Sequence, residues 1–284
     1  MNAVIIGSGN LATHLAIALH QKGVKISQIY SRTASNAELL SQQLNCKYTI
    51  HTAEIDKNAD IYIYALKDSS FHSILKRFSA PKAIHIHTSG SISMKDFYGY
   101  AENFGVFYPL QTFSKKKEID FTNIPICIEA NSDKIEKVLQ NLASLLSNKT
   151  YILSSEERKK VHLAAVFACN FTNYMYDIAH DIVLSAGVEF DILKPLIAET
   201  AKKIETLSPR EAQTGPAVRY DENTINKHLI MLDRNSHWQA IYLKLTKNIY
   251  NRHQKQKDIG FFKSSLDTIK KKMRYLALKI KNNV

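Results

Sequence analysis

Short apolar runs alternate with longer helical patterns from residue 2 to about residue 153 of the chain. This alternation is typical of a parallel sheet whose two faces are covered by helices. The expected strands are 3–6, 26–30, 61–65, 83–87, 106–108, 124–129 and 151–153. Residues 1–153 are therefore expected to form an α/β domain with a parallel sheet.

After residue 153 the apolar positions recur at helical spacing only. Ser154, Ser155 and Glu157 resemble the N-cap and first turn of a helix that continues to about Leu184. We expect further helices over 189–207, 222–231 and 233–252, and no strands. Residues 154–252 are thus predicted to form an all-α domain.

The remaining segment, residues 253–284, has a basic amphipathic pattern. Its apolar residues are spaced alternately by four and three, which places them on one stripe of a helix. They are Phe262, Leu266, Ile269, Met273, Leu276 and Ile280. This pattern favours a helix that docks on its own chain or on a partner subunit, with an anionic membrane surface as the less favoured alternative.

Composition narrows the function classes. The 284 residues are 45% hydrophobic and 23% charged, with no signal-peptide pattern and no apolar run long enough to cross a membrane. Three separated cysteines, Cys46, Cys127 and Cys169, have no metal-ligand spacing and suit a reducing cytoplasm. The net charge is +12, but nine Lys/Arg against two Asp/Glu place +7 of it in residues 253–284. With no nucleic-acid-binding motif beside it, this charge does not predict nucleic-acid binding.

A glycine motif follows the first strand directly and opens a helix. Its residues form the pattern G-x-G-x-x-A: Gly7, Ser8, Gly9, Asn10, Leu11 and Ala12. A turn of this kind presents unpaired amides and the positive end of a helix dipole to a diphosphate. The motif in this context predicts a dinucleotide site, although a glycine turn in another βαβ protein is the alternative.

The second strand ends in Ser31, Arg32 and Thr33, beside the expected adenosine ribose. An NAD site usually has a carboxylate there, whereas a guanidinium and hydroxyl groups suit the 2′-phosphate of NADP. The sequence therefore favours NADP over NAD. The alternative is that Arg32 is a solvated residue at the start of the next helix.

Four further blocks occur in a characteristic order: "IHTSGS" (86–91), "FYPLQTFS" (107–114), "VHLAAVFACNFTNYMY" (161–176) and "SPREAQTGPAVRYD" (208–221). Together with the glycine motif they resemble the bacterial Rossmann-like family that carries the domain of unknown function 2520, over about residues 1–250. That family is similar to pyrroline-5-carboxylate reductases, ketopantoate reductases and deazaflavin-dependent NADP oxidoreductases. The resemblance implies an NADP-binding Rossmann domain and a helical domain like the C-terminal domain of 6-phosphogluconate dehydrogenase.

Ligands of open α/β sheets lie beyond the carboxyl ends of the strands. One expected strand delivers His87 and Ser89 to that edge, another delivers Pro109 and Thr112, and a third ends beside the nicotinamide. The residues of this third end are Ala65, Leu66 and Lys67. For His87 a buried structural role is the alternative, and for His85, deeper on the same face, the structural role is favoured.

Related reductases commonly carry a lysine and, one turn later, an asparagine on the first helix of the second domain. Here Asn170 matches the asparagine, but Val166 stands in place of the lysine. Helical spacing places His162 on the same stripe, with Asn173 beside Asn170. Histidine titrates near neutral pH, so His162 is the candidate proton donor to a carbonyl or imine, with binding or structural roles as alternatives.

The segment 208–221 lies between helices and contains two prolines. Its Arg210, Thr214 and Arg219 suit a carboxylate or phosphate held by forked hydrogen bonds. The alternative is that Arg210–Glu211 or Arg219–Asp221 ion pairs order the segment.

These patterns predict an NADP-dependent oxidoreductase that acts on a small, anionic carbonyl, imine or alcohol. The rival class is a nonenzymatic NADP-binding sensor or scaffold, which the missing lysine favours. We expect a homodimer, as the relatives form, with no nucleic-acid partner, no metal and no membrane association.

Overall fold

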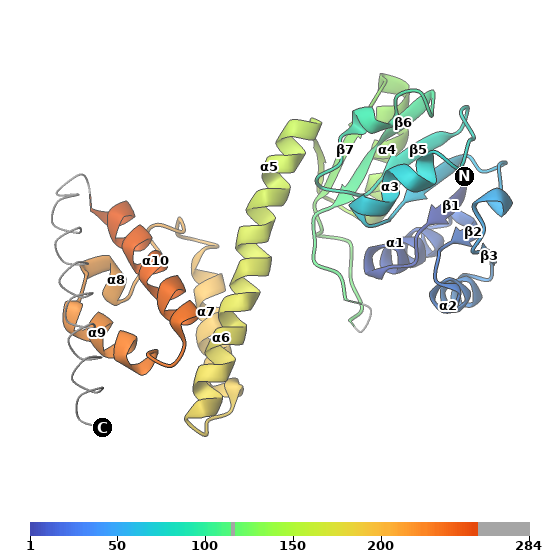
Figure 1. Cartoon of the computed structure of the whole chain (residues 1–284). Helices are drawn as coiled ribbons and strands as arrows, with labels where there is room; N and C mark the ends of the chain where they lie inside the picture. Colours follow the sequence, from blue (N-terminus) through green and yellow to red (C-terminus); the bar gives the residue numbers. More distant parts are fainter. Residues whose placement is uncertain (115–116, 255–284) are drawn as a thin grey trace. The chain divides into compact units, whose positions relative to one another are not determined.

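The computed structural model describes residues 1–114 and 117–254. It divides into two compact units, Met1–Tyr174 and Met175–Val284, which are described separately below (Figure 1). The predicted amphipathic stripe between Phe262 and Ile280 lies outside the described residues. Within the described part of the chain, no helix combines the length and the apolar character that crossing a membrane requires.

The first unit is built on an eight-stranded sheet with the order β3-β2-β1-β4-β5-β6-β7-β8. Its strands are β1 (Asn2–Ile6), β2 (Lys25–Tyr30), β3 (Lys47–Thr49), β4 (Ile61–Tyr64), β5 (Ile84–His87), β6 (Asn103–Pro109), β7 (Ile126–Ala130) and β8 (Thr150–Ile152). The connecting helices are α1 (Asn10–Gln21), α2 (Ala34–Leu44), α3 (Asp68–Leu75) and α4 (Asp133–Leu146), with short 3₁₀ turns η1 (Thr52–Glu54) and η2 (Met94–Phe97). The predicted α/β class is confirmed.

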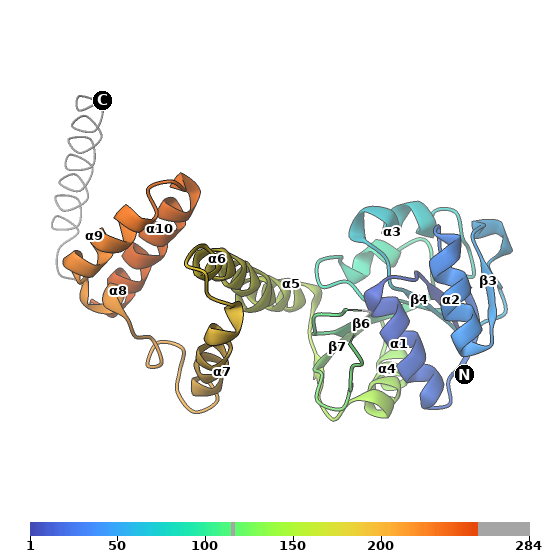
Figure 2. The ribbon, with the colours of Figure 1, turned by 90° about the horizontal axis from the view of Figure 1, so that it is seen from below.

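Both faces of the sheet are buried, which explains the continuous apolar runs of its strands. Alternate residues of β1 enter different cores: Ala3 and Ile5 pack with α1, α2 and α4 on one face. Val4 and Ile6 pack with α3 and η2 on the other face. Figure 2 shows α1, α2 and α4 together on one side of the strands and α3 on the opposite side.

Two features of the sheet differ from the expectation. β3 was not predicted, because its three residues at the sheet edge form no apolar run and only Thr49 is buried. β7 runs antiparallel to β6, whereas a parallel sheet was expected throughout. The reason is local: no crossover helix lies between these two strands, and an antiparallel neighbour needs none.

The strands give way to helices at the predicted point. α5 (Ser155–Ala165) begins with the capping box expected from the sequence, in which Ser154 and Glu157 satisfy each other's backbone N–H groups. A π-helical segment, η3 (Val166–Phe171), and α6 (Thr172–Ser185) follow. Because the compact units divide at Tyr174, twenty residues beyond this change, the domain boundary at residue 153 stays a prediction.

The second unit contains only helices among its described residues. They are the 3₁₀ turn η4 (Phe190–Leu193), α7 (Lys194–Lys203), α8 (Pro216–Arg219), α9 (Glu222–Met231) and α10 (Ser236–His253), in addition to most of α6. α9 has the predicted bounds, α7 is shorter than predicted, and α8 was not predicted. Ala217, Ile225 and Leu229 are the hydrophobic residues buried among the described part of this unit.

Candidate functional site

The glycine turn between β1 and α1 requires glycine at its first position. Gly7 has φ +132°, in the range that favours glycine, and its N–H donates to the Tyr30 carbonyl at 2.8 Å. A Cβ on Gly7 would lie 2.1 Å from the carbonyl oxygen of Ala65, the residue after β4. The turn is therefore closed by the approach of β1 to the ends of β2 and β4.

The second glycine faces open space. Gly9 is the N-cap of α1, and a Cβ there would meet no atom within 4 Å. The first turn of α1 carries no acidic residue, so its amide groups and the positive end of its dipole are available to an anion. Ala12 is fully buried and Leu11 is partly buried, consistent with the packing role of the last small residue in such motifs.

The turn is tied to the end of β2 through two hydroxyl groups. The Ser8 hydroxyl donates to the Ser31 hydroxyl at 2.7 Å, and Ser31 also accepts the backbone N–H of Thr33. Arg32 and Thr33 are exposed. Among the described residues no ion pair engages Arg32, and no carboxylate occupies positions 31–33. The end of β2 thus leaves a guanidinium open to a phosphate.

The loop after β6 reaches the amino end of α1. The Asn10 side chain donates to the Phe113 carbonyl at 2.8 Å, and a His14 ring nitrogen lies 2.9 Å from the Ser114 carbonyl. These contacts bring the exposed Thr112 near the glycine turn, whereas Pro109 is buried in β6. Directly after β4, Ala65 and Leu66 are half-buried.

Lys67 is exposed and is the N-cap of α3. The structure therefore gathers the sequence-predicted residues of β1, β2, β4 and β6 at the carboxyl edge of one sheet.

His87 lies in the core rather than on the surface of this edge. It is 1% exposed, stacks on Phe97 with ring centroids 5.7 Å apart, and accepts the Ser89 backbone N–H at Nδ1. Burial, assisted by the positive charge of Arg158, lowers the pKa of His87 to about 3, although a backbone contact at Ser93 opposes this. The imidazole is neutral at physiological pH and has no surface for a direct ligand contact.

Nε2 of His87 is buried without a hydrogen-bond partner among the described residues, whereas His85 of β5 and Ser89 after it make internal hydrogen bonds. His85 bonds the Tyr64 hydroxyl at 2.9 Å and the Ala80 carbonyl at 2.8 Å, in the structural role that the sequence favoured. Burial lowers its pKa. Ser89 is half-buried, and its hydroxyl accepts the backbone N–H groups of Ser91 and Ile92.

His162 of α5 reaches the same edge of the sheet within the first unit. Its Nδ1 lies 3.0 Å from the hydroxyl of Tyr108 in β6. A Cβ on Gly90, after β5, would lie 2.6 Å from the His162 ring, so the imidazole fits only because position 90 is glycine. Tyr108 was not among the predicted site residues, although it stands next to Pro109 in the "FYPLQTFS" block.

A buried arginine anchors α5 to the sheet. Arg158 is 1% exposed and pairs with Glu129 of β7, while its second terminal nitrogen donates to the Ile92 carbonyl and the Ser155 hydroxyl. This anchor fixes the helix one turn before His162. Sequence reasoning missed Arg158 because it stands in the run "EERKK", which has the pattern of a solvated helical surface.

The predicted stripe of His162, Asn170 and Asn173 assumed an uninterrupted α-helix, and this assumption is wrong. Residues 166–171 are π-helical, and the wider turn rotates every later position relative to the α-helical spacing, by about 100° for one additional residue. Asn170 and Asn173 are both exposed. Segments of this kind often occur at functional sites, where they redirect side chains.

The candidate anion-binding residues Arg210, Thr214 and Arg219 belong to the second unit and are described within it alone. All three are exposed. Neither of the two proposed surface ion pairs is present among the described residues. Glu211 instead accepts the Ser208 backbone N–H, and Asp221 caps α9 through Thr224.

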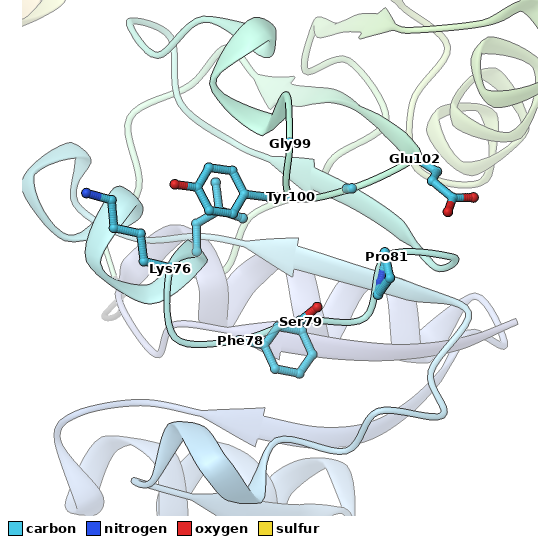
Figure 3. A pocket seen from close by; sticks show the side chains of 9 residues that line it. Lys76, Phe78, Ser79, Pro81, Gly99, Tyr100 and Glu102 are labelled. Carbon is cyan, nitrogen blue, oxygen red and sulfur yellow. The ribbon is translucent and has the colours of Figure 1, made fainter.

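Two surface pockets lie away from these residues. One, of about 480 Å³, lies between segments 75–81 and 99–102, which precede β5 and β6 (Figure 3). The other, of about 670 Å³, is lined by 57–60 and 80–84. Both are at the amino edge of the sheet, opposite the glycine turn. Among the described residues no cluster of His, Cys, Asp or Glu has the geometry of a metal site.

Comparison with known proteins supports the cofactor assignment. The family model described as "NADP oxidoreductase coenzyme F420-dependent" matches residues 2–89, and the model "Domain of unknown function (DUF2520)" matches residues 124–249. A protein from Bacteroides fragilis, designated a candidate NADP oxidoreductase, is 47% identical, with a TM-score of 0.85. The match covers 88% of this chain and 98% of that protein. No curated protein sequence matches the chain significantly.

More distant structures share the fold alone. A 1-pyrroline-5-carboxylate reductase from Streptococcus pyogenes is 15% identical, with a TM-score of 0.59 and coverage of 89% of this chain and 98% of its own. A reductive aminase from Aspergillus terreus, in complex with NADPH and ethyl-5-oxohexanoate, is 14% identical, with a TM-score of 0.64. The two chains are covered over 88% and 92%. The resemblance predicted from the sequence blocks is confirmed.

Proposed function

Because the chain belongs to the NADP oxidoreductase family whose members carry the domain of unknown function 2520, we propose that it transfers hydride between NADP and a small organic substrate. The observation that carries this proposal is the glycine turn. It combines a first glycine that cannot be replaced, an open second glycine and a helix N-terminus without acidic residues.

The residues of the turn fit the diphosphate of the cofactor. We assign the backbone of Ser8, Gly9 and Asn10 to the diphosphate, because their amides make no backbone hydrogen bond with the described residues, whereas Gly7 shapes the turn and bonds Tyr30. Ser31, Arg32 and Thr33 suit the adenosine 2′-phosphate, since Arg32 is exposed and has no carboxylate partner in the described part of the chain. The same absence of a carboxylate makes NAD the weaker ligand.

The nicotinamide end would then lie towards the ends of β4 and β5. Ala65, Leu66 and Lys67 are the candidates for lining it, by their place after β4. NADPH supplies hydride when bound, and the protein has to bind, orient and protonate the substrate.

His162 is our candidate proton donor. Its ring lies beside Gly90 and Tyr108 at the carboxyl edge of β5 and β6, and its Nε2 makes no hydrogen bond with the described residues. Hydride transfer to a carbonyl or imine leaves negative charge or a lone pair on the heteroatom, and a positioned imidazolium can protonate it. Asn170 and Asn173, exposed in and after the π-helical segment, are candidates for orienting the substrate.

We propose an anionic substrate because of two arginines in the second unit. Arg210 and Arg219 are exposed and are not engaged in ion pairs with described residues, so each can bind a carboxylate or phosphate. Thr214 offers a hydroxyl in the same segment. We assign His87 no direct contact with the substrate, because its ring is buried.

We also propose a homodimer that assembles through residues 154–252. The described part of the second unit buries few apolar side chains and exposes several large ones. They include Ile182, Leu184, Leu196, Ile230 and Met231. Light scattering should give twice the chain mass of 32.3 kDa, and a mass of one chain would contradict this. The free cysteines support a reducing cytoplasm as the location.

The reaction is tested by NADPH oxidation with a panel of keto acids, alone and with amines. We expect turnover with at least one substrate. His162→Ala should lower turnover at least about tenfold with NADPH affinity nearly unchanged, because a general acid contributes about 10²- to 10⁴-fold. Asn170→Ala should mainly raise KM.

The outcomes separate the enzyme from the alternative. NADPH binding without turnover on any substrate would contradict hydride transfer and support a nonenzymatic sensor. An unimpaired His162→Ala protein would contradict the role of His162 and leave the reaction class in place.

A further inference from the structure

We propose that Tyr108 is a positioning residue that binds His162 at Nδ1 and so reserves Nε2 for proton exchange with the substrate. This inference rests on the proposed function, in which His162 is the proton donor. The observation that supports it is the 3.0 Å hydrogen bond between the Tyr108 hydroxyl and His162 Nδ1. This contact joins β6 to α5 across 54 positions of the sequence.

The Tyr108 hydroxyl is protonated and can donate to neutral His162. Burial raises the pKa of Tyr108 to about 12, with further contributions from Cys127 and Cys169 that outweigh the opposing charge of Arg158. The phenol therefore keeps its proton at neutral pH. His162 Nδ1 is the acceptor within hydrogen-bond distance of it among the described residues. If Nδ1 carried the proton instead, the phenolic hydrogen would lose this acceptor.

The ring of His162 is also confined sterically. Its plane lies at 77° to the Tyr108 ring, with centroids 6.0 Å apart. On the Gly90 side, the positions nearest a hypothetical Cβ are His162 Cγ, Nδ1 and Cβ, at 2.6–2.8 Å. The Nδ1 side of the imidazole is thus packed against the loop after β5, and Nε2 is the nitrogen left without a partner among the described residues.

A tyrosine hydroxyl suits both charge states of a proton donor. In the resting protein, neutral His162 accepts the phenolic proton at Nδ1 and carries its own proton on Nε2. In the imidazolium both nitrogens carry protons, and Nδ1–H donates to the phenolic oxygen instead. When Nε2 of the imidazolium gives its proton to the substrate heteroatom, His162 is left neutral with its proton on Nδ1, which stays bonded to the phenolic oxygen. Uptake of a solvent proton at Nε2 restores the imidazolium, and no proton leaves the tyrosine. The hydroxyl only reverses its hydrogen bond, so the ring holds one orientation throughout.

The tautomer can be read without a substrate by NMR of the full-length protein with ¹⁵N-labelled histidine. At about pH 9, where histidine side chains are neutral, wild-type His162 should have its proton on Nε2. The signal is assigned by its loss in His162→Ala, because the chain has eleven histidines. Tyr108→Phe should reduce the excess of the Nε2–H tautomer by about fivefold, the factor that one hydrogen bond of ordinary strength supplies.

Tyr151→Phe is the matched control, because it removes a hydroxyl from an exposed tyrosine of β8 and should leave the ratio unchanged. In kinetics, Tyr108→Phe should lower kcat while NADPH affinity stays at the wild-type value, which also shows that the variant is folded. A wild-type Nδ1–H tautomer, or an unchanged ratio in Tyr108→Phe, would overturn the positioning role.

The two hypotheses fail in different measurements. Absence of turnover in the wild type overturns the proposed function, whereas the tautomer ratio is measured without any substrate. An active wild type whose Tyr108→Phe variant keeps both its kcat and its tautomer ratio overturns the role of Tyr108 alone.

Discussion

Alanine at the two turn glycines should affect different properties: stability at Gly7 and cofactor binding at Gly9. Gly7→Ala places a Cβ 2.1 Å from the Ala65 carbonyl oxygen and forces alanine to adopt φ +132°. Gly9→Ala places a Cβ where no atom lies within 4 Å. We therefore expect Gly7→Ala to destabilise the fold, and Gly9→Ala to leave the fold intact but to obstruct the cofactor.

The magnitudes follow from these contacts. The backbone strain of a residue at such a φ costs about 1–3 kcal/mol, and overpacking against a strand end costs about 1–3 kcal/mol more. The free energy of unfolding of Gly7→Ala should therefore fall by about 2–6 kcal/mol. Alanine is a poorer N-cap than glycine, so Gly9→Ala should lose no more than about 1 kcal/mol. Its NADPH affinity should fall about tenfold or more, because a methyl group occupies the approach to the diphosphate.

Urea unfolding without cofactor measures the first effect, with circular dichroism for the whole chain and Trp238 fluorescence for the second unit. Trp238 is the chain's single tryptophan and lies in α10, so its fluorescence reports on the second unit. NADPH titration measures the second effect. The reasoning is refuted if Gly7→Ala unfolds at the wild-type urea concentration, or if Gly9→Ala binds NADPH as tightly as the wild type.

Two further predictions concern the anchor of α5 and its neighbour on β5. Arg158→Met should lower the free energy of unfolding by about 3–5 kcal/mol, because it leaves Glu129 without its buried cation. The control is Lys159→Met, which breaks an exposed ion pair and should change the free energy of unfolding little in the same urea experiment. The pKa of His87 is about 3 in the folded protein and about 6.5 in the unfolded chain. The stability that neutral, buried His87 contributes is therefore fully present above about pH 6.5 and is lost as the pH falls towards 3. Between about pH 3 and 6.5 the free energy of unfolding of His87→Phe should change with pH less steeply than that of the wild type, by up to about 1.4 kcal/mol per pH unit. Equal slopes for the two proteins would contradict the assignment.

The features that the sequence predicted well are those fixed by neighbouring residues. The strands buried on both faces appear as apolar runs, and the glycine turn lies between β1 and α1 as expected. The helix start at Ser154 follows from a side chain that bonds a backbone group three positions away. In each case the determining contacts are local or repeat with a short period.

The features that were missed depend on contacts between distant segments. The direction of β7 depends on its pairing with β6, and the π-helical turn at 166–171 breaks a spacing that sequence periodicity takes as constant. In the sequence Arg158 resembles the other charged residues of a basic helix, and only the fold shows its ion pair with Glu129 of β7. Tyr108 and His162 are 54 positions apart, and only the fold shows that they share a hydrogen bond.

The central claim is that the chain binds NADP at the glycine turn and recognises its 2′-phosphate with Arg32. The direct test is a calorimetric titration of NADPH and NADH into the wild type, Arg32→Ala and Lys22→Ala, a control that removes an exposed charge at the opposite end of α1. The wild type and Lys22→Ala should bind NADPH more tightly than NADH. Arg32→Ala should narrow that preference by about 1.5–3 kcal/mol, the range for a hydrogen bond to a charged group. Equal affinities of the wild type for the two cofactors would contradict the account.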